Sequence, residues 1–253
     1  MKIRILPSSP DTGHLQHLVS FVVDGWLAVD AGCVGLCGTP RAQTAITTVL
    51  LTHSHMDHVC SLPMLAMNVL DCAGRPITAY APVAVIESLR QDVFNFRVWP
   101  DFTALKLEGH PLLSFEPMEP RRPTVIDGLT ATAIPVNHPV PTVGYLIDDG
   151  RSAVLFALDT GPTEEIWAVA GGNPRLKAAF IDVAFPDHMS ELAQAAGHLT
   201  PRLTCEQLAR LPEAVEKIAV HLKPAYYDCI VEELCRAGVP NLSVGRLGHD
   251  YEF

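Results

Sequence analysis

Long hydrophobic runs are missing from this sequence of 253 residues, although 48% of the residues are hydrophobic. A membrane-spanning helix needs about 20 consecutive apolar residues, and the best candidate, LVSFVVDGWLAVDAG, is interrupted by Asp24 and Asp30. The amino-terminal segment MKIRILPSSPDTGHLQHLV is broken by Pro7, Pro10 and Asp11, which excludes an apolar core of signal-peptide length. We therefore expect a cytoplasmic protein with no membrane partner.

The sequence also lacks paired cysteine spacings, flexible linkers and internal repeats. Its seven cysteines are an odd number with no paired spacing, which is typical of reduced thiols rather than of a disulfide framework. No Gly/Ser-rich or Pro-rich linker divides the chain, and the 21 prolines are spread along it. Since the chain has enough hydrophobic residues for a large core, we predict a single domain over residues 1–253.

Basic residues are scarce, because 18 Lys and Arg stand against 28 Asp and Glu, for a net charge of −10. A protein that binds the phosphate backbone of a nucleic acid usually presents a basic face. The charge therefore predicts no nucleic-acid partner. It does not exclude a small anionic substrate, because bound metal ions can reverse the local field.

What the sequence does contain is a series of short apolar runs bounded by Gly, Pro, Asp or Asn, which is typical of strands. They are KIRIL, HLVSFVV, GWLAVDAG, AITTVLLTH, PITAY, LTATAIPVNH, TVGYLIDD, SAVLFALDTG, AAFIDVAF, KIAVHL and NLSVG. Helical patterns lie between some of them: residues 61–73, and the segments PVAVIESLRQDVF, TEEIWAVAG, SELAQAAG, TPRLTCEQLARL and YDCIVEELCRAG. This alternation predicts an α/β (α+β) protein in which helices cover sheets.

A cluster of metal-ligand residue types follows the run AITTVLL, in the segment THSHMDH at residues 52–58. The segment contains His53, His55, Asp57 and His58. Imidazole and carboxylate groups suit zinc and similar divalent ions, but one loop cannot supply full ligand sets for two of them. A metal site here therefore requires further His and Asp residues at the ends of later strands.

Three later strand ends carry such residues. The run ATAIPVNH ends in His138, AVLFALD ends in Asp159, and KIAVH ends in His221. A set of surface loop histidines is the alternative interpretation, but so many ligand types at separate strand ends rarely arise by chance. Five other histidines lack such positions and are interpreted as surface or core residues: His14, His17, His110, His188 and His249.

The order of these residues, His-x-His-x-Asp-His followed by an isolated His, a strand-end Asp and a late His, resembles that of the metallo-β-lactamase superfamily. The resemblance implies a four-layer αββα sandwich with two divalent metal ions. It implies one ion at His53, His55 and His138, the other at Asp57, His58 and His221, and a bridge at Asp159. Zinc is the predicted metal, and the same nitrogen and oxygen ligands also accept manganese or iron.

The same resemblance implies that Asp30, in LAVDAG, supports the metal site from behind the ligands. Capping of the turn before Gly32 is an equally open role for this residue. Two divalent ions together can activate a shared water for hydrolysis of a phosphodiester or an acyl bond.

Motifs in the rest of the chain resemble the class II cyclic-nucleotide phosphodiesterases. They are FIDVAFPD, GHLTP and HLKP in the carboxy-terminal third, VFNFRVWPDFT at residues 93–103, and LVSFVV with LAVDAG near the start. The resemblance implies hydrolysis of a small-molecule substrate, cyclic AMP or cyclic GMP, to its 5′-monophosphate by hydroxide activated at the two metals. The chain departs from the family at Met56, at Asp182 and around His138, which leaves the preferred substrate open.

The resemblance also implies catalytic roles for two residues. Asp57 orients or deprotonates the water while serving as a ligand, and His198, in GHLTP, binds the phosphate and protonates the leaving oxygen. Asp182 either holds His198 in its working tautomer or only shapes a turn. Trp99 and Asn95 either contribute to a base pocket or are ordinary packing residues.

Three other functions remain as alternatives. A ribonuclease Z-like phosphodiesterase shares the metal set but normally has a basic element for transfer RNA, and the sequence shows no Lys/Arg-rich insertion. A dinuclear iron oxidoreductase typically has Glu at the position of His55 and an attached flavin domain. A sensor module that has lost catalysis usually lacks a ligand, and here none is missing. A homodimer is the default expectation for the oligomeric state.

Overall fold

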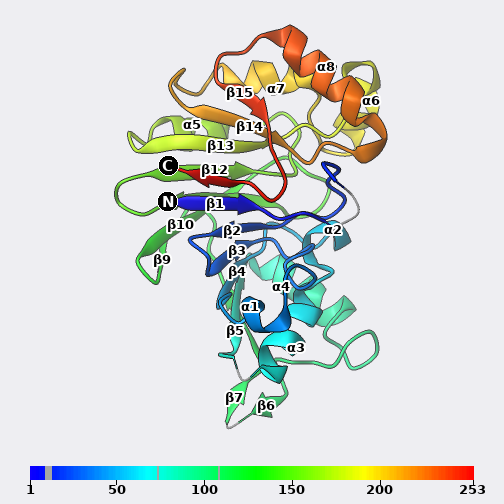
Figure 1. Cartoon of the computed structure of the whole chain (residues 1–253), viewed down its shortest axis with the longest axis vertical. Helices are drawn as coiled ribbons and strands as arrows, with labels where there is room; N and C mark the ends of the chain where they lie inside the picture. Colours follow the sequence, from blue (N-terminus) through cyan, green and yellow to red (C-terminus); the bar gives the residue numbers. More distant parts are fainter. Residues whose placement is uncertain (9–12, 73, 108) are drawn as a thin grey trace.

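Two seven-stranded sheets pack face to face in the computed structural model, which describes residues 1–8, 13–72, 74–107 and 109–253 (Figure 1). The first sheet has the order β16 (Asp250–Glu252), β1 (Lys2–Ile5), β2 (Phe21–Val23), β3 (Leu27–Val29), β4 (Thr48–Leu50), β5 (Ile77–Ala81), β8 (Leu113–Pro117). The second has the order β15 (Leu242–Val244), β14 (Glu216–Val220), β13 (Leu176–Asp182), β12 (Ala153–Ala157), β11 (Val143–Asp148), β10 (Leu129–Pro135), β9 (Thr124–Ile126). A small separate sheet pairs β6 (Lys106–Leu107) with β7 (His110–Pro111).

Helices lie outside the two sheets, with α5 to α8 beyond the second sheet in Figure 1. The first half of the chain forms α1 (Pro40–Gln43), α2 (Met56–Val59), α3 (Leu62–Asp71) and α4 (Val83–Asp92). The second half forms α5 (Glu165–Gly171), α6 (Ser190–Ala195), α7 (Pro201–Leu208) and α8 (Tyr227–Ala237), with 3₁₀ turns η1 (Asp187–Met189) and η2 (Pro224–Tyr226). Within the described ranges, no helix combines the length and apolar character needed to cross a membrane.

Apolar side chains hold these layers together. Between the sheets, the rings of Phe156 and Phe180 stack with centroids 5.2 Å apart, and Phe21 meets Phe156 edge-on at 5.3 Å. A second cluster fills the space between the first sheet and α3 and α4, and a third lies between the second sheet and α5 and α7. Each sheet thus buries both faces, which confirms the four-layer αββα fold that the family resemblance implied.

The predicted helix over residues 61–73 is α3, and it is shorter than expected because it ends at Asp71. Residue 73 lies outside the described residues. Ser61 stands at the N-cap position, but its hydroxyl donates to the carbonyl of Ala31 (2.7 Å) instead of capping the helix. The predicted stop of α8 at Gly238 is confirmed, since this glycine has the left-handed φ of 62° that commonly ends helices.

Parallel pairing gathers the ends of several strands at one edge of the sandwich. In the first sheet, β3 pairs with β4 in parallel; in the second, β12, β13 and β14 are parallel. β10 runs in the same direction as β12, because both pair with β11 antiparallel. The carboxyl ends of these strands therefore lie at a common edge, where polar residues following each strand converge.

Two hydrogen bonds join the sheets at this edge. The buried Tyr145 of β11 donates its hydroxyl to the carbonyl of Leu51 (2.7 Å), and the amide of Val143 donates to the carbonyl of Thr52 (3.1 Å). Both acceptors immediately precede the segment His53–His58 in the chain. The second sheet therefore fixes the loop that carries most of the predicted ligands.

Candidate metal centre

The first predicted ligand group converges in the structure. The donor atoms of His53, His55, His138 and Asp159 all lie within 4.8 Å of one another. Nε2 of His53 is 3.5 Å from Oδ2 of Asp159, and Nε2 of His138 is 3.2 Å from Nδ1 of His55. These residues follow β4, β10 and β12, so the strand ends bring them together as the sequence predicted.

The second group lies beside the first. Donor atoms of Asp57, His58 and His221 lie within 4.8 Å of one another. Oδ1 of Asp159 is 3.1 Å from Nε2 of His58, whereas its other oxygen, Oδ2, faces His53. Asp159 thus stands between the two groups, which is the position predicted for a bridging carboxylate.

Hydrogen bonds to Asp30 orient two of the imidazoles. Nδ1 of His58 donates to Oδ2 of Asp30 (2.6 Å), so the neutral form of this imidazole presents an unprotonated Nε2 to the cluster. Thr52 donates its hydroxyl to the same carboxylate (2.8 Å), so this hydroxyl accepts from Nδ1 of His53 (2.9 Å). Nε2 of His53 therefore also has a free lone pair. Such hydrogen bonds set the tautomer that a metal ligand requires, which supports the predicted role of Asp30.

Asp182 plays the same part on the other side of the cluster. Its Oδ2 accepts from Nδ1 of His198 (3.0 Å), and its Oδ1 accepts from Nδ1 of His221 (3.3 Å). The rings of His198 and His221 stack with centroids 5.4 Å apart. Asp182 is therefore more than a turn residue, because one buried carboxylate orients both histidines.

Unpartnered buried atoms test whether this cluster fits metal ions. Among the described residues, the buried side-chain atoms without a hydrogen-bond partner include Nε2 of His53, Nε2 of His58 and Oδ1 of Asp159. Buried polar atoms are rarely left unpaired, because each costs about 1–3 kcal/mol. All three point into the same cluster and are zinc-ligand atom types, so the residues fit a metal centre.

The charge of the cluster fits two divalent ions. Four carboxylates converge on it, those of Asp30, Asp57, Asp159 and Asp182. When ionised with neutral imidazoles, they carry a total charge of −4, which two divalent cations balance. Buried charge requires such compensation.

The pKa values of the histidines differ between the two groups. Burial lowers the pKa of His53 and of His138, so these imidazoles are neutral and ready to bind a metal. Burial also disfavours the charged form of His221, but Asp159, with Asp182 and Asp57, outweighs it and raises the pKa of His221 to about 9. In the absence of cations, protons on the second group therefore supply the positive charge that the carboxylates require.

Strained backbone supports the site. Asp30 and His221 have left-handed φ angles of 59° and 60°, a conformation that costs about 1–3 kcal/mol for such residues. Gly197 has φ of 67°, and its carbonyl accepts from Nδ1 of His138 (2.9 Å). A Cβ at Gly197 would lie 2.6 Å from Cδ of Pro139 and 2.9 Å from Cα of His138. Only glycine allows this approach.

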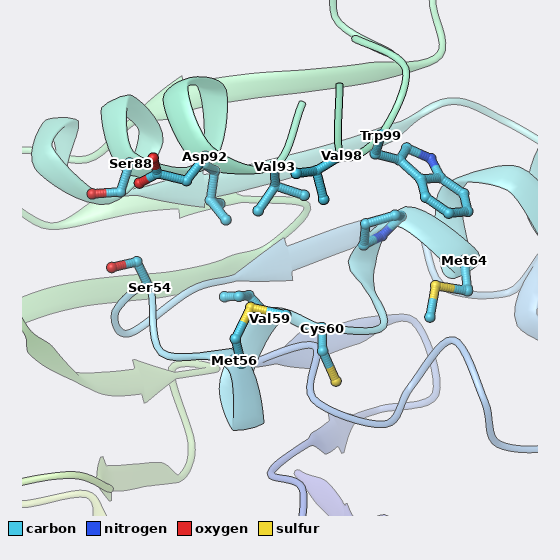
Figure 2. Close-up of a pocket in the computed structure, with 12 residues that line it drawn as sticks. Ser54, Met56, Val59, Cys60, Met64, Ser88, Asp92, Val93, Val98 and Trp99 are labelled. Carbon is cyan, nitrogen blue, oxygen red and sulfur yellow. The ribbon is translucent and has the colours of Figure 1, made fainter. Parts of the chain in front are cut away.

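A cavity of about 280 Å³ lies behind the ligand loop. Figure 2 shows Ser54 and Met56, which alternate with the ligand residues, on one wall of it, with Ser54 facing Ser88 and Met56 below Val98, and Trp99 at the other end. Of the two residues predicted for a base pocket, Trp99 lines the cavity. The side chain of Asn95 instead forms hydrogen bonds within its own loop. Asn95 donates to the carbonyl of Gln91 (2.7 Å) and accepts from the amides of residues 97 and 98 (2.9 Å each).

Sequence reasoning missed three residues of the site. Thr52 stands directly before the ligand residues, and a threonine at the end of a strand is too common to indicate a role in the site. The glycine of GHLTP was noted only as part of a motif. Gln16 accepts the backbone amide of His221 with its Oε1 (3.0 Å) from 205 residues away in the chain, and no local pattern reveals such a contact.

Comparisons with known proteins concern the family and the fold of the chain. The sequence profile of the β-lactamase superfamily domain matches residues 26–222. A probable 3′,5′-cyclic-nucleotide phosphodiesterase of Yersinia pestis is 26% identical over 210 residues, which cover 73% of this chain and 59% of that protein. The ribonuclease Z of Kineococcus radiotolerans is 34% identical over 254 residues, which cover 82% of this chain and 77% of that protein.

The fold is also found in solved structures. The crystal structure of unliganded yeast PDE1 superimposes with a TM-score of 0.79, at 19% sequence identity and 98% coverage of both chains. At this identity the similarity concerns the fold alone. The chain spans 59% to 62% of the length of the first curated relatives that it matches, and these are named as a phosphodiesterase and as ribonucleases Z.

Proposed function

The chain belongs to the β-lactamase superfamily, and from that premise we propose that it is a metal-dependent phosphodiesterase that hydrolyses 3′,5′-cyclic nucleotides to 5′-monophosphates. The seven residues of the two groups would hold two divalent ions, with zinc as the expected metal. When bound, such ions would supply activation of a water and compensation of the phosphate charge. The side chains of the protein carry out the proton transfers and orient the substrate.

The position of His198 is the observation that best supports phosphodiester hydrolysis. It is buried, its Nδ1 is held by Asp182, and its Nε2 faces the cluster, 3.9 Å from Oδ2 of Asp159. An imidazolium in this position donates the Nε2 proton to the ribose 3′-oxygen as the bond from phosphorus to that oxygen breaks. Asp182 fixes the orientation of the ring through the hydrogen bond from Nδ1.

Asp57 is placed to act on the water. Its side chain is 35% exposed, whereas the other carboxylates of the cluster are buried, and its Oδ2 is 3.3 Å from Nε2 of His221. Asp57 accepts the proton of the water as the oxygen of that water bonds to phosphorus. The proton removed here and the proton donated by His198 balance, so the products are the 5′-monophosphate and its free 3′-hydroxyl.

The cavity behind the ligand loop supports a substrate with a single ring system. Its volume of about 280 Å³ lies near the lower limit of about 300 Å³ for ligand pockets. Apolar side chains dominate it, with Ser88 and Asp92 as polar groups at the wall formed by α4 (Figure 2). The base of one nucleotide matches this size and this mixture of apolar and polar groups.

A substrate panel tests the proposal. Zinc-loaded protein should hydrolyse cyclic AMP or cyclic GMP, and the non-specific ester bis(p-nitrophenyl) phosphate more slowly. A His53→Ala variant, prepared in the same way, should be inactive and so exclude a contaminating phosphodiesterase. Turnover of a precursor transfer RNA without turnover of either cyclic nucleotide would reject the proposal.

Ribonuclease Z-type cleavage is the second candidate, because the relative from Kineococcus radiotolerans with that name is 34% identical. The same metal groups and the same proton donor serve either substrate. The net charge of −10 disfavours a polyanionic RNA, because such binding relies on Lys and Arg contacts to phosphates. The precursor RNA in the substrate panel decides between the two candidates.

A further inference from the structure

A separate cluster of metal-ligand atoms lies outside the seven-residue centre. His188 on η1, with Cys229 and Glu233 on α8, places one imidazole nitrogen, one thiol sulfur and one carboxylate oxygen within 4.8 Å of one another. Cys229 and Glu233 are four residues apart on one helix, so they share a face of α8. His188 comes from η1, a different segment of the chain, and supplies the third ligand atom.

The geometry of the group matches a small divalent cation. The thiol of Cys229 donates a hydrogen bond to Oε1 of Glu233, with Sγ and Oε1 3.7 Å apart. Tetrahedral zinc, with bonds of about 2.3 Å to sulfur and about 2.1 Å to oxygen, places these two atoms about 3.6 Å apart. The second oxygen of Glu233 accepts the backbone amide of Asp187 (2.8 Å), which holds the carboxylate in position as outer hydrogen bonds do at metal sites.

We infer that His188, Cys229 and Glu233 form a third metal site, which binds zinc or a similar thiophilic divalent ion. Binding replaces the proton of the Cys229 thiol, which is released to solvent, by the metal ion. The thiolate and the carboxylate then neutralise the two charges of the cation, and the fourth coordination position is left to water. No oxidation or reduction is involved.

The location gives this site a structural consequence. η1 follows β13, which ends at Asp182, and the same segment continues through α6 to His198. α8 follows β14 and the turn that begins after His221. A cation shared by η1 and α8 therefore ties together the two segments that carry His198 and His221.

Cobalt substitution tests the third site independently of enzymatic activity. The full chain is stripped of metal with a chelator and titrated with Co²⁺ while its absorption spectrum is recorded. The seven-residue centre contains no sulfur ligand, so a thiolate-to-cobalt charge-transfer band in the near ultraviolet reports a site with cysteine. We expect this band to saturate at one ion per chain in the wild-type protein.

Variants identify the residues responsible. Cys229→Ser should abolish the band, and His188→Ala, a change at an exposed side chain, should weaken cobalt binding at least tenfold. Cys235→Ser, on the same helix but outside the group, is the matched control and should retain the band. The inference is wrong if the wild type shows no band, if Cys229→Ser retains it, or if only Cys60→Ser, near the main centre, removes it.

Discussion

At the scale of single residues, strand-end placement made the candidate site readable from the sequence. His53, His138 and His221 each follow an apolar run, and the structure brings them together with Asp159 at one edge of the sandwich. That these residues bind metal stays a prediction. The residues behind them were harder to find, because a supporting contact such as that of Gln16 with His221 spans 205 residues and has no local pattern.

His198→Ala is the prediction that tests the proton donor. Because His198 faces the cluster and is held by Asp182, its loss should lower kcat by about 10²–10⁴-fold. The metal content, measured by mass spectrometry of the purified protein, should remain at the wild-type value. His249→Ala, at a surface position outside the site, is the control and should leave both quantities unchanged. Loss of metal from His198→Ala would make His198 a ligand and not the proton donor.

At the scale of elements, long helices and hydrophobic strands were predictable, and short edge elements were not. The sequence predicted α4, α7 and α8 close to their observed bounds, because each has an apolar face, and α8 also ends at a glycine. It missed β8, β9 and β16, which are three to five residues long. All three are edge strands of their sheets, and pairing with a neighbouring strand that is distant in the chain or follows a tight turn decides their conformation.

Gly197→Ala is a prediction about the turn between α6 and α7. The left-handed φ of 67° and the contact with His138 leave no room for a methyl group, so the change should destabilise the fold by more than about 1 kcal/mol. It should also displace the carbonyl that holds His138 and so weaken metal binding. Chemical denaturation and zinc titration measure the two effects. Gly150→Ala, where a methyl group meets nothing within 4 Å, is the control for the cost of φ alone.

The end of β11 gives a prediction about pH. Hydrogen bonds from Arg175, at 2.8 to 3.1 Å, lower the pKa of Asp148. The folded state therefore holds the proton of this carboxyl less tightly than the unfolded chain, whose Asp pKa is near 3.9. The stability that Asp148 contributes is present above about pH 4 and is lost as the pH falls through the lower folded value.

Asp148→Asn should therefore destabilise the protein at pH 7 and have a much smaller effect at the lowest pH at which the fold survives. Urea unfolding of both proteins across this range measures the difference. Arg175→Gln should reproduce the same pattern, because it removes the other half of the pair. An effect of Asp148→Asn that is constant with pH would show that the ion pair is not its source.

At the scale of the whole molecule, the pairing of the two terminal strands at one edge of the first sheet could not be predicted from the sequence. β1 pairs with β16, so that the amino-terminal nitrogen of Met1 donates to the carbonyl of Phe253 (2.7 Å), and the two ends of the chain lie side by side (Figure 1). Arg4 and Asp250 join the same strands through a two-pronged ion pair (2.6 and 2.8 Å). Such contacts depend on the complete fold, whereas the alternation of strands and helices predicted that helices cover sheets, and the family resemblance implied the order of the layers.

Metal removal should destabilise the whole molecule, because the carboxylates of the centre then rely on protonated histidines for compensation. An ion present at 100 times its dissociation constant stabilises a fold by about 2.7 kcal/mol. For a chain of this size, each kcal/mol shifts Tm by about 2–4 °C. Calorimetry of the chelated and the zinc-loaded protein should therefore show a clear rise in Tm with zinc. His53→Ala should reduce this rise, and an unchanged Tm in the wild type would contradict a metal-bearing centre.

The most direct test of the central claim is the product formed from cyclic AMP in ¹⁸O-enriched water, followed by ³¹P nuclear magnetic resonance. If the centre hydrolyses the cyclic phosphodiester as proposed, zinc-loaded protein will yield adenosine 5′-monophosphate with one ¹⁸O atom on phosphorus. The same result is expected for cyclic GMP if it is a substrate. Recovery of both cyclic nucleotides unchanged, or formation of the 3′-monophosphate, would contradict the proposed reaction.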